Sequence, residues 1–595
     1  MLVQALSIRN FRGVKTLDWT LSSRLVCVAG PGDSGKTTVL DAIALALSSR
    51  WSLSLTDADF YQCNVTDPIT IDVTVTDLPA ELEKEDACGH WLRGVLPDGT
   101  VVDEPEPEAQ RALTVRFRVD ESLEPTWTLF KDALSTQEHR LSANRRAAFG
   151  CFQLDDSTQL HLRWAHGSAL SHLTGTAGVA DVITSAHRLA RQVVYEKPPA
   201  GLLDASVRAG DVVRAIGATE VKNPRPGLDP NMVGRSNWLV LHDGPIPVTR
   251  LGLGSQRLAS LAFQLEAAAS ESIVLVDEIE RGLEPHRLMH LLAQLRDRAC
   301  SGHGQVFLTT HSPLVVEAAP KSLFIMRCRH GTATIASVPS TVTNAVDPVP
   351  VIRSGPSSIL ARRVVVCEGK TEVGLCRSLA RHWDSDAMVP RAVVGTVFRH
   401  GGGSRAPLYA DVLAGLGYPT ALLIDDDLAQ NKNKDAWTKN VEKARAAGVQ
   451  VIRWEAGYSV EEQITAILPA TGLQAFVALA KTFIEAEDPQ RSLLDSVASQ
   501  LVEHLGSGVV LSGLDPNDWC SVLGCSMDEV RRALGRAAKK RGWFKDETRG
   551  ERLGALLVRH LDAIQTSHPP FFALLTTLKG FAYELIDHTS TEAHP

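Results

Sequence analysis

The chain has 595 residues, 44% of them hydrophobic and 22% charged, and a formal net charge of −8. This length exceeds what one hydrophobic core supports, so two to four domains are expected, and the composition excludes wholesale disorder. The negative charge excludes attraction of the whole surface to nucleic acid, so any such contact needs a local basic patch. The sequence shows neither a membrane-length apolar run nor a signal peptide, and its scattered cysteines favour reduced thiols in the cytoplasm.

The first strands lead into a phosphate-binding motif. Apolar and β-branched residues predict strands over Leu2–Ile8, Lys15–Leu21 and Arg24–Ala29. The third strand is followed directly by Gly30–Thr37, a full match to G-x-x-x-x-G-K-[ST], and then by a helix over 38–48. This order of strand, glycine loop and helix is the context in which the motif binds nucleotide phosphates.

The residue types in this loop are suited to a nucleotide and its metal ion. Glycines let the backbone wrap the phosphates, Lys36 reaches the terminal phosphates, and Thr37 is a ligand for Mg²⁺. The sequence therefore predicts an ATP site near the N-terminus. Its expected cofactor-binding residues are Gly30, Gly32, Asp33, Ser34, Gly35, Lys36, Thr37 and Thr38.

The segments that follow predict a strand layer and then a helical insertion. Alternating apolar residues predict strands over Ile69–Val75, Leu113–Val119 and Thr126–Phe130, typical of an antiparallel layer beside the nucleotide-binding sheet. From about 166 to 217 the pattern becomes helical, and no sustained heptads are present. We therefore expect a compact helical insertion over 166–235, used as a dimer contact, instead of a long coiled-coil arm.

A second acidic motif completes the ATPase pattern. The apolar strand Ser272–Val276 ends in Asp277 and Glu278, the Walker B arrangement, in which Asp277 holds Mg²⁺ through water and Glu278 orients or deprotonates the attacking water. Gly252–Arg257 precedes this strand, and the next one ends at His311. This order resembles the ABC-type ATPases.

That resemblance implies a switch role for His311, which would sense the γ-phosphate, and an ATP molecule bound across a dimer by the signature loop of the other subunit. The signature differs from the transporter pattern, because Leu253 stands where a phosphate-facing serine is usual, and Ser255 is the candidate substitute.

The C-terminal half carries a cluster of acids at strand ends. The β-branched run Val364–Val366 leads to Glu368, and Glu372 lies in the first turn of the following helix. A second strand, Thr420–Ile424, ends in Asp425-Asp426-Asp427, where Asp425 and Asp427 point to the same face. Carboxylates gathered this closely repel one another unless a cation lies between them, so a divalent-metal site is predicted.

Strand-Glu-helix followed by strand-Asp-x-Asp resembles the Toprim fold of topoisomerases, primases and one group of nucleases. In such nucleases a further acid follows a later strand, here Val449–Trp454, and Glu461 is favoured over Glu462 for this position. Charged residues at a helix start are also common for capping alone. The expected metal ligands are Glu368, Glu372, Asp425, Asp427 and Glu461.

The last 126 residues, 470–595, read as mostly helical. The helix expected over Met527–Arg541 has one apolar stripe and one basic face. The basic face is either a solvated surface or, beside a metal site, a phosphate-binding surface. Its residues are Arg532, Arg536, Lys539 and Lys540. Lys545 follows Trp543-Phe544, an aromatic pair that would be buried and would hold this lysine at a fixed point.

An ABC-type ATPase followed by a Toprim domain resembles the OLD (overcoming lysogenization defect) family of nucleases, which includes the nuclease subunit of Gabija-type anti-phage systems. The resemblance covers nearly the whole chain. It rests on the following residues of the two halves: Gly30–Thr37, Asp277-Glu278 and His311 in the first, and Glu368, Glu372, Asp425 and Asp427 in the second. It implies an oligomeric, metal-dependent DNA endonuclease with a catalytic lysine near the C-terminus. Lys545 is the candidate by position, with Lys540 second.

The resemblance also implies cofactors and partners. These are ATP with one Mg²⁺, two Mg²⁺ or Mn²⁺ ions at the Toprim site, DNA, a homodimer or higher homo-oligomer, and in some members a UvrD-like helicase.

The expected fold class is α/β, an ABC/SMC-like P-loop ATPase with a helical dimerisation insertion followed by a Toprim domain with helical additions. The expected divisions are 1–165 and 236–336 for the ATPase, 166–235 for the insertion, 337–358 for a linker, 359–469 for Toprim and 470–595 for the C-terminal helices.

The expected activity is ATP-regulated hydrolysis of DNA phosphodiester bonds at a two-metal site, in phage defence or DNA repair. The catalytic residues are Glu368, Asp425, Asp427 and Lys545, with Glu278 in the ATPase. The alternative is a RecF/SMC-like repair ATPase that binds DNA without cleaving it, which gives no reason for the acid cluster. A topoisomerase-like enzyme needs a tyrosine nucleophile, and neither Tyr409 nor Tyr458 lies in a recognisable strand-breaking domain.

Overall fold

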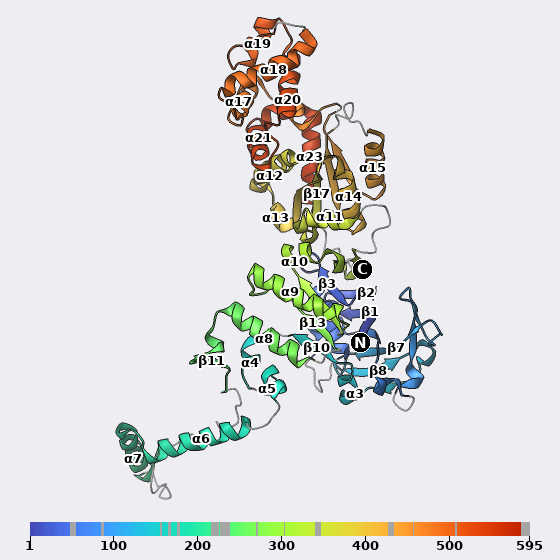
Figure 1. Ribbon diagram of the computed structural model, residues 1–595, viewed down its shortest axis with the longest axis vertical. Helices are drawn as coiled ribbons and strands as arrows, with labels where there is room; N and C mark the ends of the chain where they lie inside the picture. The colour runs from blue at the N-terminus through green and yellow to red at the C-terminus, as the bar shows by residue number, and fades with distance from the viewer. Residues whose placement is uncertain are drawn as a thin grey trace.

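A computed structural model describes residues 1–47, 55–84, 88–154, 157–164, 168–174, 179–215, 225–226, 239–268, 272–302, 304–338, 347–425, 434–455, 457–505 and 509–584. Two bodies of secondary structure follow one another along the long axis, the N-terminal half at the bottom of Figure 1 and the C-terminal half at the top. No helix in the described part of the chain is long and apolar enough to cross a membrane.

The N-terminal half is built on one mixed sheet of 14 strands in the order β10-β13-β14-β3-β15-β16-β2-β1-β4-β7-β5-β6, with β8 and β9 continuing from β7. The strands β13, β14 and β3 are parallel and consist entirely of buried residues, as expected for strands covered on both faces. The strand bounds are β1 Leu2–Phe11, β2 Val14–Thr20, β3 Leu25–Ala29, β4 Ile69–Thr76, β5 Arg93–Val95, β6 Val101–Val102, β7 Gln110–Val119, β8 Thr126–Phe130, β9 His139–Arg140, β10 Cys151–Leu154, β13 Ile273–Val276, β14 Gln305–Thr310, β15 Leu323–Arg329 and β16 Thr332–Ser337.

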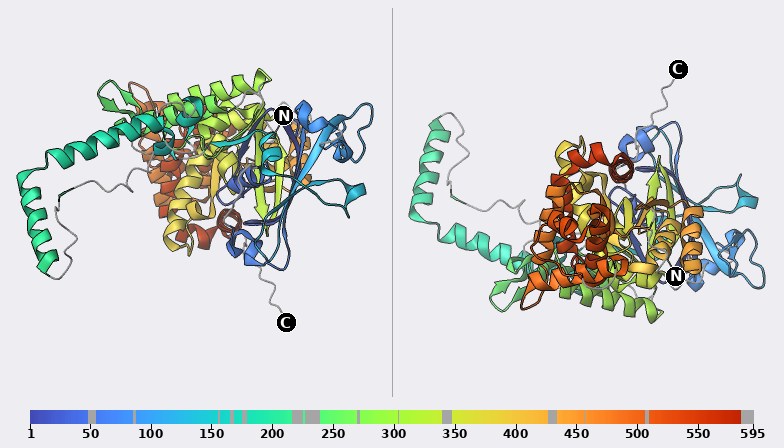
Figure 2. Two further views of the ribbon diagram at one scale, coloured as in Figure 1. Left: turned by 90° about the horizontal axis from the view of Figure 1, so that it is seen from below. Right: turned by 90° about the horizontal axis from the view of Figure 1, so that it is seen from above.

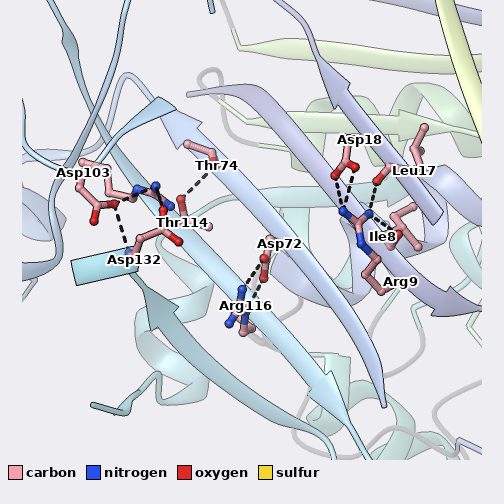
Figure 3. Close-up of polar contacts among 11 residues, drawn as sticks. Ile8, Arg9, Leu17, Asp18, Asp72, Thr74, Asp103, Thr114, Arg116 and Asp132 are labelled. Atoms are coloured by element: carbon pink, nitrogen blue, oxygen red, sulfur yellow. Dashed lines mark hydrogen bonds and ion pairs between the residues drawn. The ribbon is translucent and has the colours of Figure 1, made fainter. Parts of the chain in front are cut away.

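The antiparallel part of this sheet is held by polar pairs between neighbouring strands (Figure 3). Arg116 and Asp72 lie opposite each other on β7 and β4 and form a bidentate ion pair with both distances at 2.7 Å. Two residues further along β4 and two residues back along β7, the hydroxyls of Thr74 and Thr114 lie 2.8 Å apart. Cross-strand pairs of this kind fix the register of the sheet. This layer was expected from the alternating sequence pattern and is confirmed.

Helices cover the parallel part of the sheet and lead to the insertion. In the expected insertion, α6 and α7 extend away from the body (Figures 1 and 2) and do not fold into a compact unit. Their apolar side chains Leu189, Val193 and Leu202 are 63%, 60% and 53% exposed, so the described residues of this chain provide no core for them to enter. The helices of this half are α1 Lys36–Leu47, α2 Ala80–Glu83, α3 Ala143–Ala147, α4 Thr158–His161, α5 Ala169–Thr174, α6 Val179–Glu196, α7 Ala200–Ala215, α8 Leu253–Ala267, α9 Pro285–Cys300 and α10 Pro313–Ala318.

The C-terminal half has a parallel four-stranded sheet in the order β18-β17-β19-β20. One hydrophobic core joins this sheet to the C-terminal helices, so these helices complete the same body. The elements are α11 Pro348–Arg353, β17 Arg363–Cys367, α12 Lys370–Asp386, α13 Arg391–Val394, β18 Thr396–His400, α14 Ala406–Gly415, β19 Thr420–Ile424, α15 Lys434–Ala446, β20 Gln450–Arg453, α16 Val460–Ile467, α17 Ala470–Lys481, α18 Pro489–Leu505, α19 Pro516–Leu523, α20 Met527–Arg541, α21 Glu547–Arg559, α22 Leu561–Ser567 and α23 Pro569–Tyr583.

The two halves are packed directly against each other. A second core contains residues of both halves. Within the expected linker 337–358, residues 347–358 form α11 and a 3₁₀ turn. Val351 and Ile352 on α11 enter that core, and the buried guanidinium of Arg399 donates to the Val351 carbonyl at 3.1 Å. The ATPase and the C-terminal body are therefore mechanically connected.

Candidate functional site

The phosphate-binding loop sits where the sequence predicts it, between β3 and α1. Gly30 has a φ of 154°, and a Cβ at this position would collide with the carbonyl of Met326 on the neighbouring strand β15. Asp33 at the tip of the loop has a φ of 59°, a conformation that non-glycine residues seldom adopt. Backbone that departs this far from regular structure is characteristic of a loop shaped around a ligand.

Lys36 is folded back onto its own loop. Its ammonium group donates to the carbonyl of Pro31 at 2.8 Å and to the carbonyl of Gly30 and the hydroxyl of Ser34 at 3.3 Å. Burial lowers the pKa of Lys36 to about 8, against the opposing influence of Asp277 and neighbouring acids. A buried lysine surrounded by acceptors is suited to exchange these contacts for phosphate oxygens.

The Walker B acids meet the loop as expected. Asp277 accepts from the hydroxyl of Thr37 at 3.1 and 3.2 Å and from that of Thr309 at 2.5 Å, so the two proposed Mg²⁺-binding residues, Thr37 and Asp277, are adjacent. Glu278 follows with a φ of 45°, and its backbone N–H donates to the hydroxyl of Thr309 at 2.8 Å.

Sequence reasoning missed Glu280, which holds the backbone at His311, the residue predicted to act as the switch histidine. Its carboxylate accepts from the backbone N–H of His311 at 2.5 Å and from the hydroxyl of Thr310 at 2.7 Å. The signal that could have identified it is spacing, because a third acid lies two residues beyond Glu278. The His311 side chain itself is exposed.

The signature segment begins α8, and Gly252 is its N-cap. Leu253 is 79% exposed, while Gln256 and Arg257 are buried. The hydroxyl of Ser255 accepts from Arg287 at 3.1 Å within the same chain. The outward-facing start of α8 is open to a second subunit, and the cross-subunit role of Ser255 stays a prediction.

In the C-terminal half, Glu368 and Asp425 come together at the ends of the adjacent parallel strands β17 and β19. The backbone N–H of Asp425 donates to the Glu368 carboxylate at 3.0 Å, and the Asp425 carboxylate accepts from the backbone N–H of Val460 at 3.1 Å. Burial raises the pKa of Glu368, and burial together with Glu372, Glu368 and Glu461 raises that of Asp425 well above its ordinary value. These carboxylates repel one another in a partly buried site.

Glu372 and Glu461 close the cluster from two helices. Glu372 is 4% exposed and accepts from the backbone N–H of Gly369 at 2.9 Å, and Glu461 is 5% exposed at the start of α16. Burial and then Glu461 raise the pKa of Glu372 to about 8. Glu462, the disfavoured alternative, forms an ion pair with Arg536 at 3.2 Å. This arrangement supports the prediction of Glu461.

The basic residues of α20 divide into two groups. Lys539 is half-buried. Its positive charge lowers the pKa of Glu368 and of Asp425, against the larger effect of their burial, so Lys539 lies close enough to act on both acids. Arg536 is engaged with Glu462, whereas Arg532 and Lys540 are exposed. The expected continuous basic face is therefore split between the carboxylate cluster and solvent.

Lys545 acts on a different member of the cluster, Glu461. The preceding Trp543 and Phe544 are buried, as expected, and the Phe544 carbonyl accepts from the hydroxyl of Thr371 on α12 at 2.8 Å. Lys545 is exposed, and its charge opposes the rise that burial causes in the pKa of Glu461. Both Lys539 and Lys545 can thus act on the cluster, and Lys539 is the one that acts on Glu368 and Asp425.

The donor chemistry of this cluster fits divalent metal ions. Its members are oxygen ligands whose mutual repulsion and burial call for a cation, the setting in which Mg²⁺ binds carboxylates. Among the residues that the structure describes, no three His, Cys, Asp or Glu side chains are already arranged around one ion. Asp427, an expected ligand, lies outside the described residues.

Comparison with known families finds ATPase models in the N-terminal half and a Toprim model in the C-terminal half. The model "AAA domain" matches residues 5–91, and "AAA domain, putative AbiEii toxin, Type IV TA system" matches 226–317. The model "Overcoming lysogenization defect protein-like, TOPRIM domain" matches 359–427, the span that holds Glu368, Glu372 and Asp425. The chain joins ATPase modules to an OLD-like Toprim domain. No curated protein sequence matches this chain.

Solved structures with similarity to the chain include SMC heads. The SMC head domain from Thermotoga maritima shares 15% identity, covering 57% of this chain and 99% of that one at a TM-score of 0.28. An Smc head with an extended coiled coil, bound to the C-terminal domain of ScpA derived from Pyrococcus furiosus, shares 12% identity, covering 56% and 95% at a TM-score of 0.33.

A chain of contacts connects the phosphate loop to the OLD-like Toprim domain. Arg362, which directly precedes β17, lies with its guanidinium 3.6 Å from the carboxylate of Asp33. The buried Arg327 on β15 donates to the Arg362 carbonyl at 2.9 Å and stacks on Tyr418 of the Toprim domain at 4.4 Å. In the chain, only the strand β17 lies between Arg362 and Glu368. A displacement of the phosphate-binding loop can therefore be transmitted through Arg362 and β17 to the carboxylate cluster.

We expect the metal-free protein to lose stability as the pH rises from about 4.5 to about 8. The folded state keeps the proton of Glu372 in this window, because its pKa is raised to about 8, whereas the unfolded state releases it. Stability from such a group is complete at low pH and falls by up to about 1.4 kcal/mol per pH unit as the pH rises. Denaturant unfolding in a chelating buffer measures this slope.

Glu372→Gln is the control for this prediction, because glutamine cannot ionise and the variant should show a flatter slope. Saturating Mg²⁺ should stabilise the wild type more at pH 8 than at pH 6, since the ion competes with a proton at the lower pH. Equal slopes for the wild type and Glu372→Gln would contradict the assignment.

Proposed function

We propose that this chain is an ATP-regulated, divalent-metal-dependent DNA endonuclease. The observation that carries the proposal is the cluster of Glu368, Glu372, Asp425 and Glu461 at the strand ends of the OLD-like Toprim domain, with Lys539 beside it. Neither ATP binding nor fold stability requires such a concentration of buried carboxylates. Metal-dependent cleavage of plasmid DNA that is lost in a Glu368 variant tests the proposal.

Two ions at this site would be held by Glu368, Glu372, Asp425 and Glu461, with Asp427 completing the set. Divalent ions stabilise the charge of a phosphodiester transition state and lower the pKa of a bound water. The chain's own contribution is orientation. The backbone N–H groups of Asp425 and Val460 fix the Glu368 and Asp425 carboxylates, and Lys539 offsets negative charge next to them.

ATP is proposed to regulate cleavage and not to supply its energy, since hydrolysis of DNA is already favourable. The contact of Arg362 with Asp33, and of Arg327 with the Arg362 carbonyl, gives nucleotide binding a route to β17 and Glu368. A nucleotide that binds differently to two arrangements of this connection shifts the population of active sites.

Assembly as a homodimer or higher oligomer is supported by the extended helices α6 and α7. Their exposed Leu189, Val193 and Leu202 need an apolar partner, and a second copy of the same arm provides one. A role in phage defence or DNA repair, and a UvrD-like helicase partner, rest on the resemblance to the OLD family alone.

Replacing Lys539 by alanine is expected to lower the cleavage rate by on the order of 100-fold, because a preorganised charge next to the reacting phosphate is lost. Lys540→Ala is the matched control, since this neighbouring lysine is exposed. Lys545→Ala tests the lysine favoured by sequence position. Equal rates for Lys539→Ala and Lys540→Ala would contradict the role of Lys539.

A further inference from the structure

A cavity of about 510 Å³ opens beside the carboxylate cluster. It lies between α12 and α21, and Lys370, the first residue of α12, is only two residues beyond Glu368. Seven residues line the cavity: Lys370, Phe483, Asp546, Glu547, Thr548, Arg549 and Arg552. None of them belongs to the cluster of metal-binding acids.

The walls of this cavity are held rigidly by glycine contacts between the two helices. A Cβ at Gly374 on α12 would collide with the backbone of α21, and one at Gly550 on α21 would collide with the Thr371 carbonyl. The hydroxyl of Ser378 also donates to the Glu551 carbonyl at 2.6 Å. The position of α21 relative to Glu368 is therefore fixed by close backbone packing.

The charges in the walls leave a positive surplus. Arg549 is engaged, with Glu485 at 3.3 Å and Asp546 at 2.9 Å, and Glu547 pairs with Arg377 at 2.5 Å. Lys370 and Arg552 are exposed and form no ion pair within the described residues. Lys370 and Arg552 therefore line the cavity without an ion-pair partner among the described residues. The two acids of the lining, Asp546 and Glu547, are each paired with an arginine.

Phe483 provides the apolar part of the cavity. The guanidinium carbons of Arg549 and Arg552 lie 5.4 and 5.5 Å from its ring centroid, and the ring packs edge-on against the buried Phe544 at 5.8 Å. An arginine held against an aromatic ring presents a preordered fork to phosphate oxygens, and both groups offer faces on which a base can stack.

We infer that this cavity is a strand-binding cleft, which holds the DNA strand next to the bond that is cut. The inference rests on the proposed endonuclease function. Lys370 and Arg552 bind phosphates of that strand, and a base stacks against Phe483 and the adjacent guanidinium groups. The cleft favours a polynucleotide because two cations and an aromatic ring line it together, and because Lys370 in its wall is only two residues from Glu368.

The test measures DNA affinity in a background that cannot cleave. Anisotropy of a labelled DNA duplex with a single-stranded end is titrated with Glu368→Gln protein in chelating buffer, at several salt concentrations. Adding Lys370→Ala and Arg552→Ala together should weaken binding about tenfold or more and reduce the slope of log Kd against log salt by about two. Phe483→Leu should weaken binding with little change in the slope.

Arg445→Ala is the matched control, an exposed arginine on α15, which lies on the opposite flank of the sheet in Figure 1. Thermal unfolding of each variant shows whether it is folded. If the Lys370→Ala/Arg552→Ala protein binds DNA with the same affinity and the same salt slope as Arg445→Ala, the proposed cleft is refuted. An effect seen only with RNA of the same sequence, or equal displacement of the duplex by free mononucleotide, would also refute it.

Failure of the cleft and failure of the nuclease are distinguishable. Wild-type protein that cleaves with metal, together with a Lys370→Ala/Arg552→Ala protein that cleaves equally fast at low DNA concentration, refutes the cleft and leaves the nuclease intact. Wild-type protein that neither binds nor cleaves DNA refutes both.

Discussion

Replacing Glu368 by alanine is expected to abolish metal-dependent DNA cleavage, with a loss on the order of 1000-fold or more. A divalent ion contributes several kcal/mol to stabilisation of the transition state, and each 1.4 kcal/mol corresponds to a factor of ten in rate. Glu368 directly follows β17, and its carboxylate accepts from the backbone N–H of Asp425. The measurement is the rate of plasmid nicking in saturating Mg²⁺ or Mn²⁺.

Glu368→Gln separates loss of a ligand from loss of structure. Glutamine keeps the size of the side chain and an oxygen that accepts from the Asp425 N–H, but it removes a charge that burial makes unfavourable. We expect this variant to be at least as stable as the wild type without metal and to bind ATP normally. Cleavage retained by Glu368→Ala and by Asp425→Ala would show that the site lies elsewhere.

Lys36→Ala is expected to weaken ATP binding by about tenfold to a hundredfold, the effect of losing a charged hydrogen bond to phosphate. Cleavage by this variant should then be insensitive to ATP at concentrations that act on the wild type. The ammonium group of Lys36 donates hydrogen bonds within its own loop, to Gly30, Pro31 and Ser34, and not to the Toprim domain in the described part of the chain. Its effect on cleavage therefore reports the nucleotide alone.

Arg362→Ala tests the route between the two sites. Its side chain reaches Asp33 from outside the loop, so ATP should still bind, while the response of cleavage to ATP should be reduced. A Lys36→Ala protein with an unchanged cleavage rate and an unchanged ATP response would refute the coupling. An ATP response preserved in Arg362→Ala would refute this particular route.

Much of the fold could be predicted because local patterns determine it. The strand Thr420–Ile424 and the helix Met527–Arg541 have the bounds expected from their apolar patterns and caps. The short strands β5, β6, β9 and β10 were missed, since two to four residues carry too little periodicity. Arg116 and Asp72 likewise form their pair across strands that the sequence separates by 44 residues.

The site was predictable where acids directly follow strands, as at Glu368 and Asp425. The role of Lys539 was not, because it depends on how α20 packs against α16. Gly535 permits that packing, since a Cβ there would lie 2.6 Å from the backbone of Glu462. The sequence periodicity of α20 shows that the helix has a basic face. The packing of α20 against α16 determines that Lys539 is the residue of this face that lies near Glu368 and Asp425.

The most direct measurement is cleavage of supercoiled plasmid with Mg²⁺ or Mn²⁺, with and without ATP, by the wild type and Glu368→Ala. The proposed function predicts nicking that requires the metal, is lost in Glu368→Ala and changes with ATP in the wild type. Metal-dependent nicking of equal rate in both proteins, or none by the wild type under any of these conditions, would contradict it.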